Sequence, residues 1–133
     1  MNVTALKAWI AGAGIVVILY VTWFVVLQAS QYSEVLVFLL WLSPLAAAFV
    51  SAYLAPRKKI LLGMLMVLPT TISAVTLNFV YQWLGNAVDF PGLRGALILF
   101  TTTLVYSGIL CVLGSAGGIV LAKKFRGRVK RTQ

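Results

Sequence analysis

The sequence contains no histidine, one cysteine and only two acidic residues among its 133 positions. Without histidine, the chain lacks the commonest general base and the commonest transition-metal ligand. Cys111 has no second cysteine to pair with, so the disulfide scaffold of a small secreted protein is excluded. Charged residues make up 10% of the chain, whereas about 25% is usual in a soluble domain. The composition therefore excludes an ordinary soluble enzyme and a disordered tail.

Apolar residues fill the chain instead, at 62% of all positions, and they gather in four long runs without a charged side chain. Each run exceeds the roughly 18 residues that indicate a spanning helix, and none alternates as barrel strands do. The predicted spans are residues 8–27, 35–54, 60–80 and 96–121. The sequence thus predicts an all-α membrane protein, a four-transmembrane-helix bundle over residues 1–122, followed by a basic cytoplasmic tail over 123–133.

The basic residues predict the orientation of these spans. Ten of the eleven Lys and Arg residues fall on one side: Lys7, Arg57, Lys58, Lys59, Lys123, Lys124, Arg126, Arg128, Lys130 and Arg131. Arg94 falls on the other side, together with both acids, Glu34 and Asp89. Cations collect on the cytoplasmic side of membrane spans, so we expect both termini in the cytoplasm of a multi-pass protein of the bacterial cytoplasmic (inner) membrane.

The same basic residues suggest a partner. They flank apolar segments, so we interpret them as topology determinants and not as a nucleic-acid site. A cation near the bilayer surface also attracts anionic lipid headgroups. The predicted lipid contacts are Arg57, Lys58, Lys59, Lys123, Lys124 and Arg126.

Small residues recur at four-residue spacing in the second and fourth spans. Such stripes lie on one helix face and let helix backbones approach closely. The predicted packing or interface residues are Ser43, Ala47, Ser51, Thr103, Ser107, Gly114 and Gly118. The stripes have two interpretations: packing within the four-helix bundle, which we favour, or contact with another molecule.

The third span carries a proline and several polar side chains. Pro69 lacks an amide hydrogen, so it should kink the helix and free a carbonyl one turn earlier. Thr70, Thr71 and Asn78 form a possible polar face inside the membrane.

The spans carry no Asp, Glu, Lys or Arg, and the chain has no phosphate-binding loop, metal-ligand cluster or nucleophile–base pair. We therefore expect no enzyme activity, no cofactor and no metal. The expected function is a non-catalytic accessory, assembly or regulatory subunit of a membrane complex, with a membrane-protein partner. The alternative is a homo-oligomer that forms a pore, carrier or holin-like protein.

Overall fold

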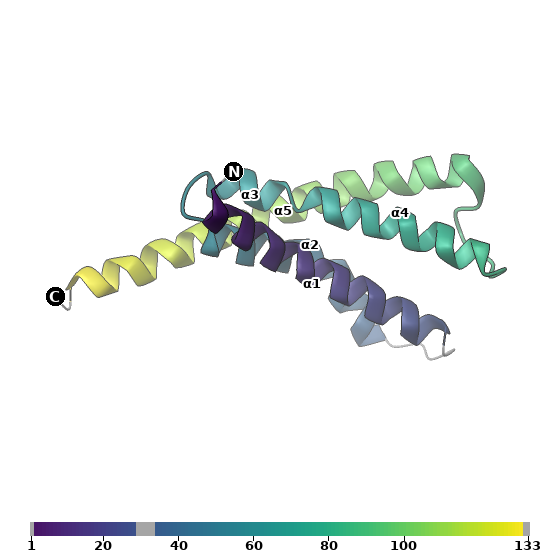
Figure 1. Cartoon of the computed structure of the whole chain (residues 1–133), viewed down its shortest axis with the longest axis horizontal. Coiled ribbons are helices and arrows are strands. Elements are labelled where there is room, and N and C mark those ends of the chain that lie inside the picture. The colour runs from purple at the N-terminus through teal and green to yellow at the C-terminus, as the bar shows by residue number, and fades with distance from the viewer. Residues whose placement is uncertain (1, 29–33, 132–133) are drawn as a thin grey trace.

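The computed structural model of the chain describes residues 2–28 and 34–131, which contain five helices and no strand. The helices are α1 (Val3–Gln28), α2 (Glu34–Leu54), α3 (Lys59–Met64), α4 (Val67–Trp83) and α5 (Gly92–Arg131) (Figure 1). The all-α prediction is confirmed for these residues. The chain holds four helical stretches long and apolar enough to cross a membrane, since α3 and α4 together form the stretch Lys59–Trp83. By length and composition it is suited to a multi-pass membrane protein, as predicted.

The third predicted span is divided between Met64 and Val67, one turn before Pro69. Because Pro69 has no amide hydrogen, the Leu65 carbonyl loses its usual partner four residues later. It accepts a bond from the Leu68 amide instead, at 3.2 Å, and the Met66 amide turns to the Gly63 carbonyl at 3.1 Å. The kink expected at Pro69 is therefore present as a break between α3 and α4.

The long helices form a ring in which each packs on two neighbours. α2 packs on α1 and α5, while α4 packs on α5 and α1. α3 fills the space between α2 and α5 at one end of this ring. Figure 1 shows two helix pairs, α1 with α2 and α4 with α5, that meet around α3 and separate toward the opposite end.

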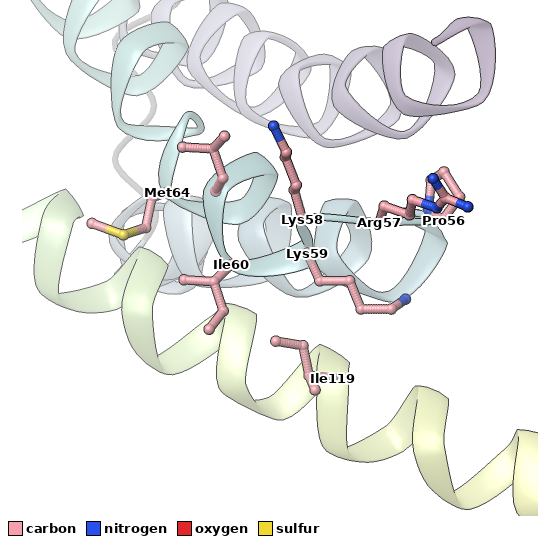
Figure 2. A pocket seen from close by; sticks show the side chains of 8 residues that line it. Pro56, Arg57, Lys58, Lys59, Ile60, Met64 and Ile119 are labelled. Carbon is pink, nitrogen blue, oxygen red and sulfur yellow. The ribbon is translucent and has the colours of Figure 1, made fainter. Parts of the chain in front are cut away.

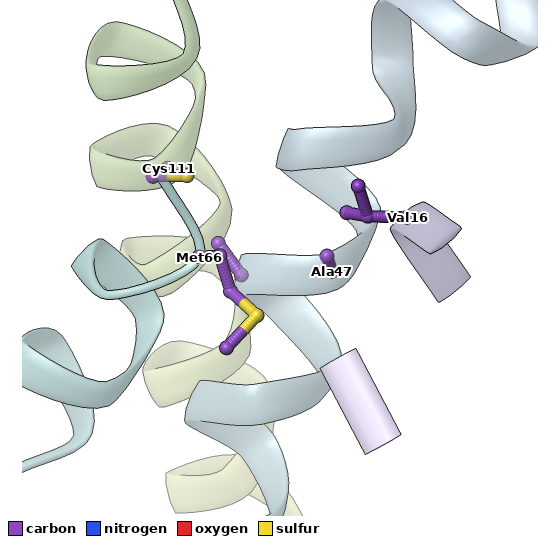
Figure 3. Packing of buried hydrophobic residues seen from close by; sticks show 5 residues of the cluster. Val16, Ala47, Met66 and Cys111 are labelled. Atoms are coloured by element: carbon purple, nitrogen blue, oxygen red, sulfur yellow. The ribbon is translucent and has the colours of Figure 1, made fainter. Parts of the chain in front are cut away.

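The core lies at the level of the α3–α4 break and is built mainly of small side chains. Met66 comes from the break itself, and it is fully buried among Val16, Ala47, Ala48 and Cys111 (Figure 3). A second cluster, nearer α3, consists of Ala8, Ala55 and Leu62. Such residues suit a bundle in lipid, where helices associate by close van der Waals packing.

The last helix extends beyond the apolar run 96–121 at both ends. α5 has 40 residues, which is about 60 Å at 1.5 Å per residue, and it continues ten residues past Leu121 to Arg131. The predicted tail is therefore largely helical and projects from the bundle (Figure 1), while residues 132–133 lie outside the described part. The helix continues because Lys and Arg are good helix formers and no proline follows Leu121. We call the end of the molecule with Lys7, the turn 57–59 and residues 123–128 the basic end; α1 begins there, and α2 and α5 run toward it.

Candidate functional site

The small residues that the sequence singled out lie in helix contacts within the chain. Ser43, Ala47 and Ser51 of α2 are buried, and Ala47 also contacts the core around Met66. On α5, Ser107, Gly114 and Gly118 are buried, and Thr103 is half-buried. Gly114 and Gly118 of α5 face Leu45 and Phe49 of α2, whereas Ala47 and Ser51 of α2 face Gly12 of α1. Both stripes are therefore occupied within the chain, each by a different neighbour.

Glycines set the distance between the helix backbones. A Cβ atom at Gly118 would come within 2.5 Å of the Phe49 carbonyl oxygen, and one at Gly114 would overlap the Leu45 carbonyl oxygen. On α1, a Cβ at Gly12 would lie 2.7 Å from both the Ala47 carbonyl oxygen and the Met66 sulfur. α1 and α5 thus approach α2 as closely as a missing side chain permits. Sequence reasoning overlooked Gly63 of α3, where a Cβ would overlap the Ser115 hydroxyl.

The buried hydroxyl groups of α5 are satisfied by their own helix. The Ser107 hydroxyl donates to the Thr103 carbonyl, and the Ser115 hydroxyl donates to the Cys111 carbonyl, each at 2.6 Å. Between helices, the Ser51 hydroxyl of α2 donates to the Leu62 carbonyl of α3 at 3.4 Å. These groups do not depend on water or a ligand to be satisfied.

Pro44 creates a second polar contact, which the sequence analysis overlooked. As at Pro69, the carbonyl four residues earlier, Leu40, lacks its usual partner, and the Ser43 hydroxyl donates to it at 2.7 Å. α5 uses the same turn of α2: the Cys111 thiol lies 3.6 Å from the Pro44 carbonyl, and the Tyr106 hydroxyl donates to the Trp41 carbonyl. The rings of Tyr106 and Trp41 also meet edge to face, 5.3 Å apart. Pro44 could have indicated from the sequence that this turn of α2 has a freed carbonyl. Nothing in the sequence indicated which residues of α5 contact the turn.

The predicted polar face of the third span is not continuous. The Thr70 hydroxyl donates to the Met66 carbonyl at 2.8 Å, so it caps the break. The Asn78 amide donates to the Phe90 carbonyl at 3.1 Å and holds the loop between α4 and α5. Thr71 differs, because it is 2% exposed and its hydroxyl has no hydrogen-bond partner within the described residues.

At the basic end, Lys59 closes the turn between α2 and α3. Its ammonium group donates to the carbonyls of Ala52, Tyr53 and Ala55, at 3.1, 3.4 and 2.6 Å. A cation in this position satisfies terminal carbonyls and complements the negative end of the helix dipole. Of the predicted lipid contacts, Lys59 is thus engaged inside the chain, whereas the others are exposed: Arg57, Lys58, Lys123, Lys124 and Arg126.

An open groove of about 620 Å³ lies beside this turn (Figure 2). It is lined by the turn, by α3 and by one residue of α5: Pro56, Arg57, Lys58, Lys59, Ile60, Leu61, Met64 and Ile119. Cations therefore stand at one end of the groove, and apolar side chains form the remainder.

Within residues 2–28 and 34–131, no three His, Cys, Asp or Glu side chains are grouped so that they could hold a metal ion. Comparison with protein-family models, with curated proteins and with solved structures gave no match to this chain. Function must then be argued from the helix contacts and the groove themselves.

Proposed function

We propose that the chain is a non-catalytic integral membrane protein that acts as an accessory, assembly or regulatory subunit of a membrane complex. The close packing around Met66 carries this proposal. At Gly12, Gly63 and Gly114 the neighbouring helices leave no room for a methyl group. A single chain packed in this way offers its outer surface, and not a passage through its centre.

We also propose that the protein lies in the bacterial cytoplasmic membrane with both termini in the cytoplasm. The gathering of Lys7, the turn 57–59 and the end of α5 at one end supports this orientation (Figure 1). In this orientation the last turns of α5 project into the cytoplasm.

The partner would contact the outward faces of the helices, because the small-residue stripes of α2 and α5 are used within the chain. Large side chains point outward from three elements: Phe38 of α2 is 64% exposed, Phe79 of α4 is 40% exposed and Phe125 of α5 is 50% exposed. Phe38 and Phe79 would face neighbours inside the bilayer, and Phe125 would face one at its surface.

The test replaces one of these phenylalanines at a time by the photo-crosslinking analogue p-benzoylphenylalanine, followed by irradiation in cells and mass spectrometry. We expect one position to give a single adduct with a foreign membrane protein, in amounts comparable to the chain itself. The other two positions are matched controls for random collision. Adducts with further copies of this chain alone would overturn the accessory role.

A second candidate, an oligomeric pore, carrier or holin-like protein, is favoured by one observation. The Thr71 hydroxyl is buried without a partner within the described residues, and an unsatisfied buried group costs about 1–3 kcal/mol unless water or an ion reaches it.

Cysteine accessibility separates the two candidates. Thr71→Cys, in a Cys111→Ala background, should resist a membrane-impermeant thiol reagent, because the reaction needs a thiolate in water. Ile72→Cys, which points outward from the next position, is the matched control. Rapid labelling of Cys at position 71 alone would place a water path beside α4 and favour the pore.

A further inference from the structure

The groove beside the α2–α3 turn changes character along its length. Arg57, Lys58 and Lys59 stand at the end nearest the turn. Ile60, Leu61 and Met64 follow along α3, and each of the three is more than two-fifths exposed. Ile119 of α5 forms the opposite wall (Figure 2).

We propose that this groove binds one anionic phospholipid, with its phosphate at the basic turn that carries Arg57 and Lys58, and an acyl chain along Ile60, Met64 and Ile119. The order of the residues matches the order of the lipid's parts. α3 leads from the basic end toward the core around Met66, so a lipid in the groove would place its headgroup at the membrane surface and its chain toward the bilayer interior. The inference rests on the proposed membrane insertion but not on the proposed partner.

The charge at this end favours an anion. The chain's two acidic side chains are far away, Glu34 at the start of α2 and Asp89 in the loop between α4 and α5, both at the opposite end. Burial lowers the pKa of Lys59, and the positive charge of Arg126 on α5 lowers it further. Neither acidic side chain therefore neutralises the turn. A lipid phosphate bound there would gain about fivefold in affinity for each cation near the surface.

The turn is also held in a fixed shape. Lys59 is bonded to carbonyls at the end of α2, whereas Arg57 and Lys58 are exposed and extend to different sides of the turn (Figure 2). Lys58 adopts a left-handed backbone conformation, with φ 48° and ψ 44°, which a residue with a Cβ rarely takes. The two free cations thus sit on a preorganised turn, whereas Lys123 and Lys124 lie on the surface of a projecting helix.

Native mass spectrometry of the purified full chain tests the proposal. The protein, in a nonionic detergent, is mixed with dioleoyl phosphatidylglycerol or with dioleoyl phosphatidylcholine, which share their acyl chains and differ in charge. We expect the first phosphatidylglycerol molecule to bind at least about fivefold more tightly than the first phosphatidylcholine molecule. Equal retention of the two lipids would overturn the proposal.

Two matched variants locate the headgroup site. Arg57→Gln with Lys58→Gln should weaken binding of the first phosphatidylglycerol by about twentyfold to thirtyfold. Lys123→Gln with Lys124→Gln removes the same charge outside the groove and should leave this first binding step unchanged. An equal loss in both variants would mean diffuse attraction to the basic end and would refute a site in the groove.

A third variant examines the apolar part of the groove without changing its charge. Ile60→Thr with Met64→Gln keeps the side-chain sizes close to the originals and should weaken binding of both lipids. If this variant retains both lipids as well as the unaltered protein does, the acyl chain does not lie along Ile60 and Met64. The substituted Lys and Arg residues are exposed, and so are Ile60 and Met64. Each variant should therefore still fold.

Discussion

A glycine in a helix contact and a glycine that faces outward have different effects on stability. Both cost a helix about 1 kcal/mol relative to alanine, because glycine has greater backbone freedom in the unfolded chain. At Gly114 this cost is offset by the close approach of α5 to the Leu45 carbonyl. At Gly108, six residues earlier on the same helix, no atom of another helix lies within 4 Å of the position of a Cβ, so no contact offsets this cost.

We therefore expect alanine to have opposite effects at these two positions. Gly108→Ala should stabilise the protein by up to about 1 kcal/mol through helix propensity. Gly114→Ala should destabilise it by about 1–3 kcal/mol, because the added methyl group forces α5 away from α2. Thermal unfolding in detergent, followed by circular dichroism, measures both changes. Gly14→Ala and Gly12→Ala form a second matched pair on α1, and equal effects within each pair would contradict the role assigned to the glycines.

Tyr106 contacts Trp41 in two ways, through a hydrogen bond from its hydroxyl and through its aromatic ring, and a substitution can separate the two. Tyr106→Phe keeps the edge-to-face rings and removes the bond to the Trp41 carbonyl. A hydrogen bond between membrane helices contributes about 0.6 kcal/mol on average and up to about 1.7 kcal/mol. We expect a loss of stability in this range, measured by thermal unfolding. Tyr53→Phe, at an outward-facing position, is the control. An equal loss of stability in this control would show that removing any tyrosine hydroxyl has the same effect, and it would contradict a specific role for the bond to Trp41.

Small-residue spacing predicted which residues lie on a helix face, but not which helix faces them. Ser43, Ala47 and Ser51 share a face of any helix, because four-residue spacing repeats at nearly one turn. Which helix they meet depends on how the helices are turned and shifted relative to one another, and the local sequence does not determine this: Ala47 and Ser51 face Gly12 of α1, not the glycines of α5. The same limit explains why Tyr106 was not expected to reach the turn at Pro44.

At the scale of elements, hydropathy predicted the number of long helices, but an apolar run does not define where a helix begins and ends. Apolar runs predicted spans 8–27 and 96–121, whereas α1 begins at Val3 and α5 ends at Arg131. Hydropathy indicates which part of a helix lipid would surround. The helix itself continues as long as its residues favour helical backbone hydrogen bonds. Lys and Arg are good helix formers, so α5 continues beyond its apolar part. Pro69 did predict an interruption, because a missing amide hydrogen acts through the backbone alone.

The turn after α2 shows how one cation can fix the junction of two elements. α2 ends at Leu54, just before Pro56, and Lys59 satisfies carbonyls that would otherwise lack partners. Lys59→Met keeps the apolar stem and removes the ammonium group, so we expect a loss of about 1 kcal/mol in stability. Lys58→Met removes the same charge one position away, where no bond to α2 is made, and should be nearly neutral. Thermal unfolding of the two variants measures the difference, and equal effects would reduce the role of Lys59 to general charge.

At the scale of the whole molecule, the ring of helices leaves a charge difference between its ends. The basic end carries three separate basic segments, contributed by α1, by the turn after α2 and by α5. The opposite end carries Arg94 with the chain's two acids, Glu34 and Asp89. An even number of spans requires the two termini to share a side of the membrane. The structure accordingly places the start of α1 and the end of α5 at one end of the molecule, together with the turn after α2.

This charge difference predicts which end stays in the cytoplasm. Alkaline phosphatase folds only outside the cytoplasm, so its fusion after residue 88, in the loop between α4 and α5, should be active. Its fusion after residue 57, in the basic turn, should be silent, and a green fluorescent protein fused at each position should give the reverse pattern. Adding cations to the opposite end, by Asn86→Lys and Asp89→Lys, should lower the phosphatase activity at 88, because positively charged loops resist export. Activity at 57 in the unaltered chain would show that the basic end faces outward, and it would also place the lipid groove in the outer leaflet.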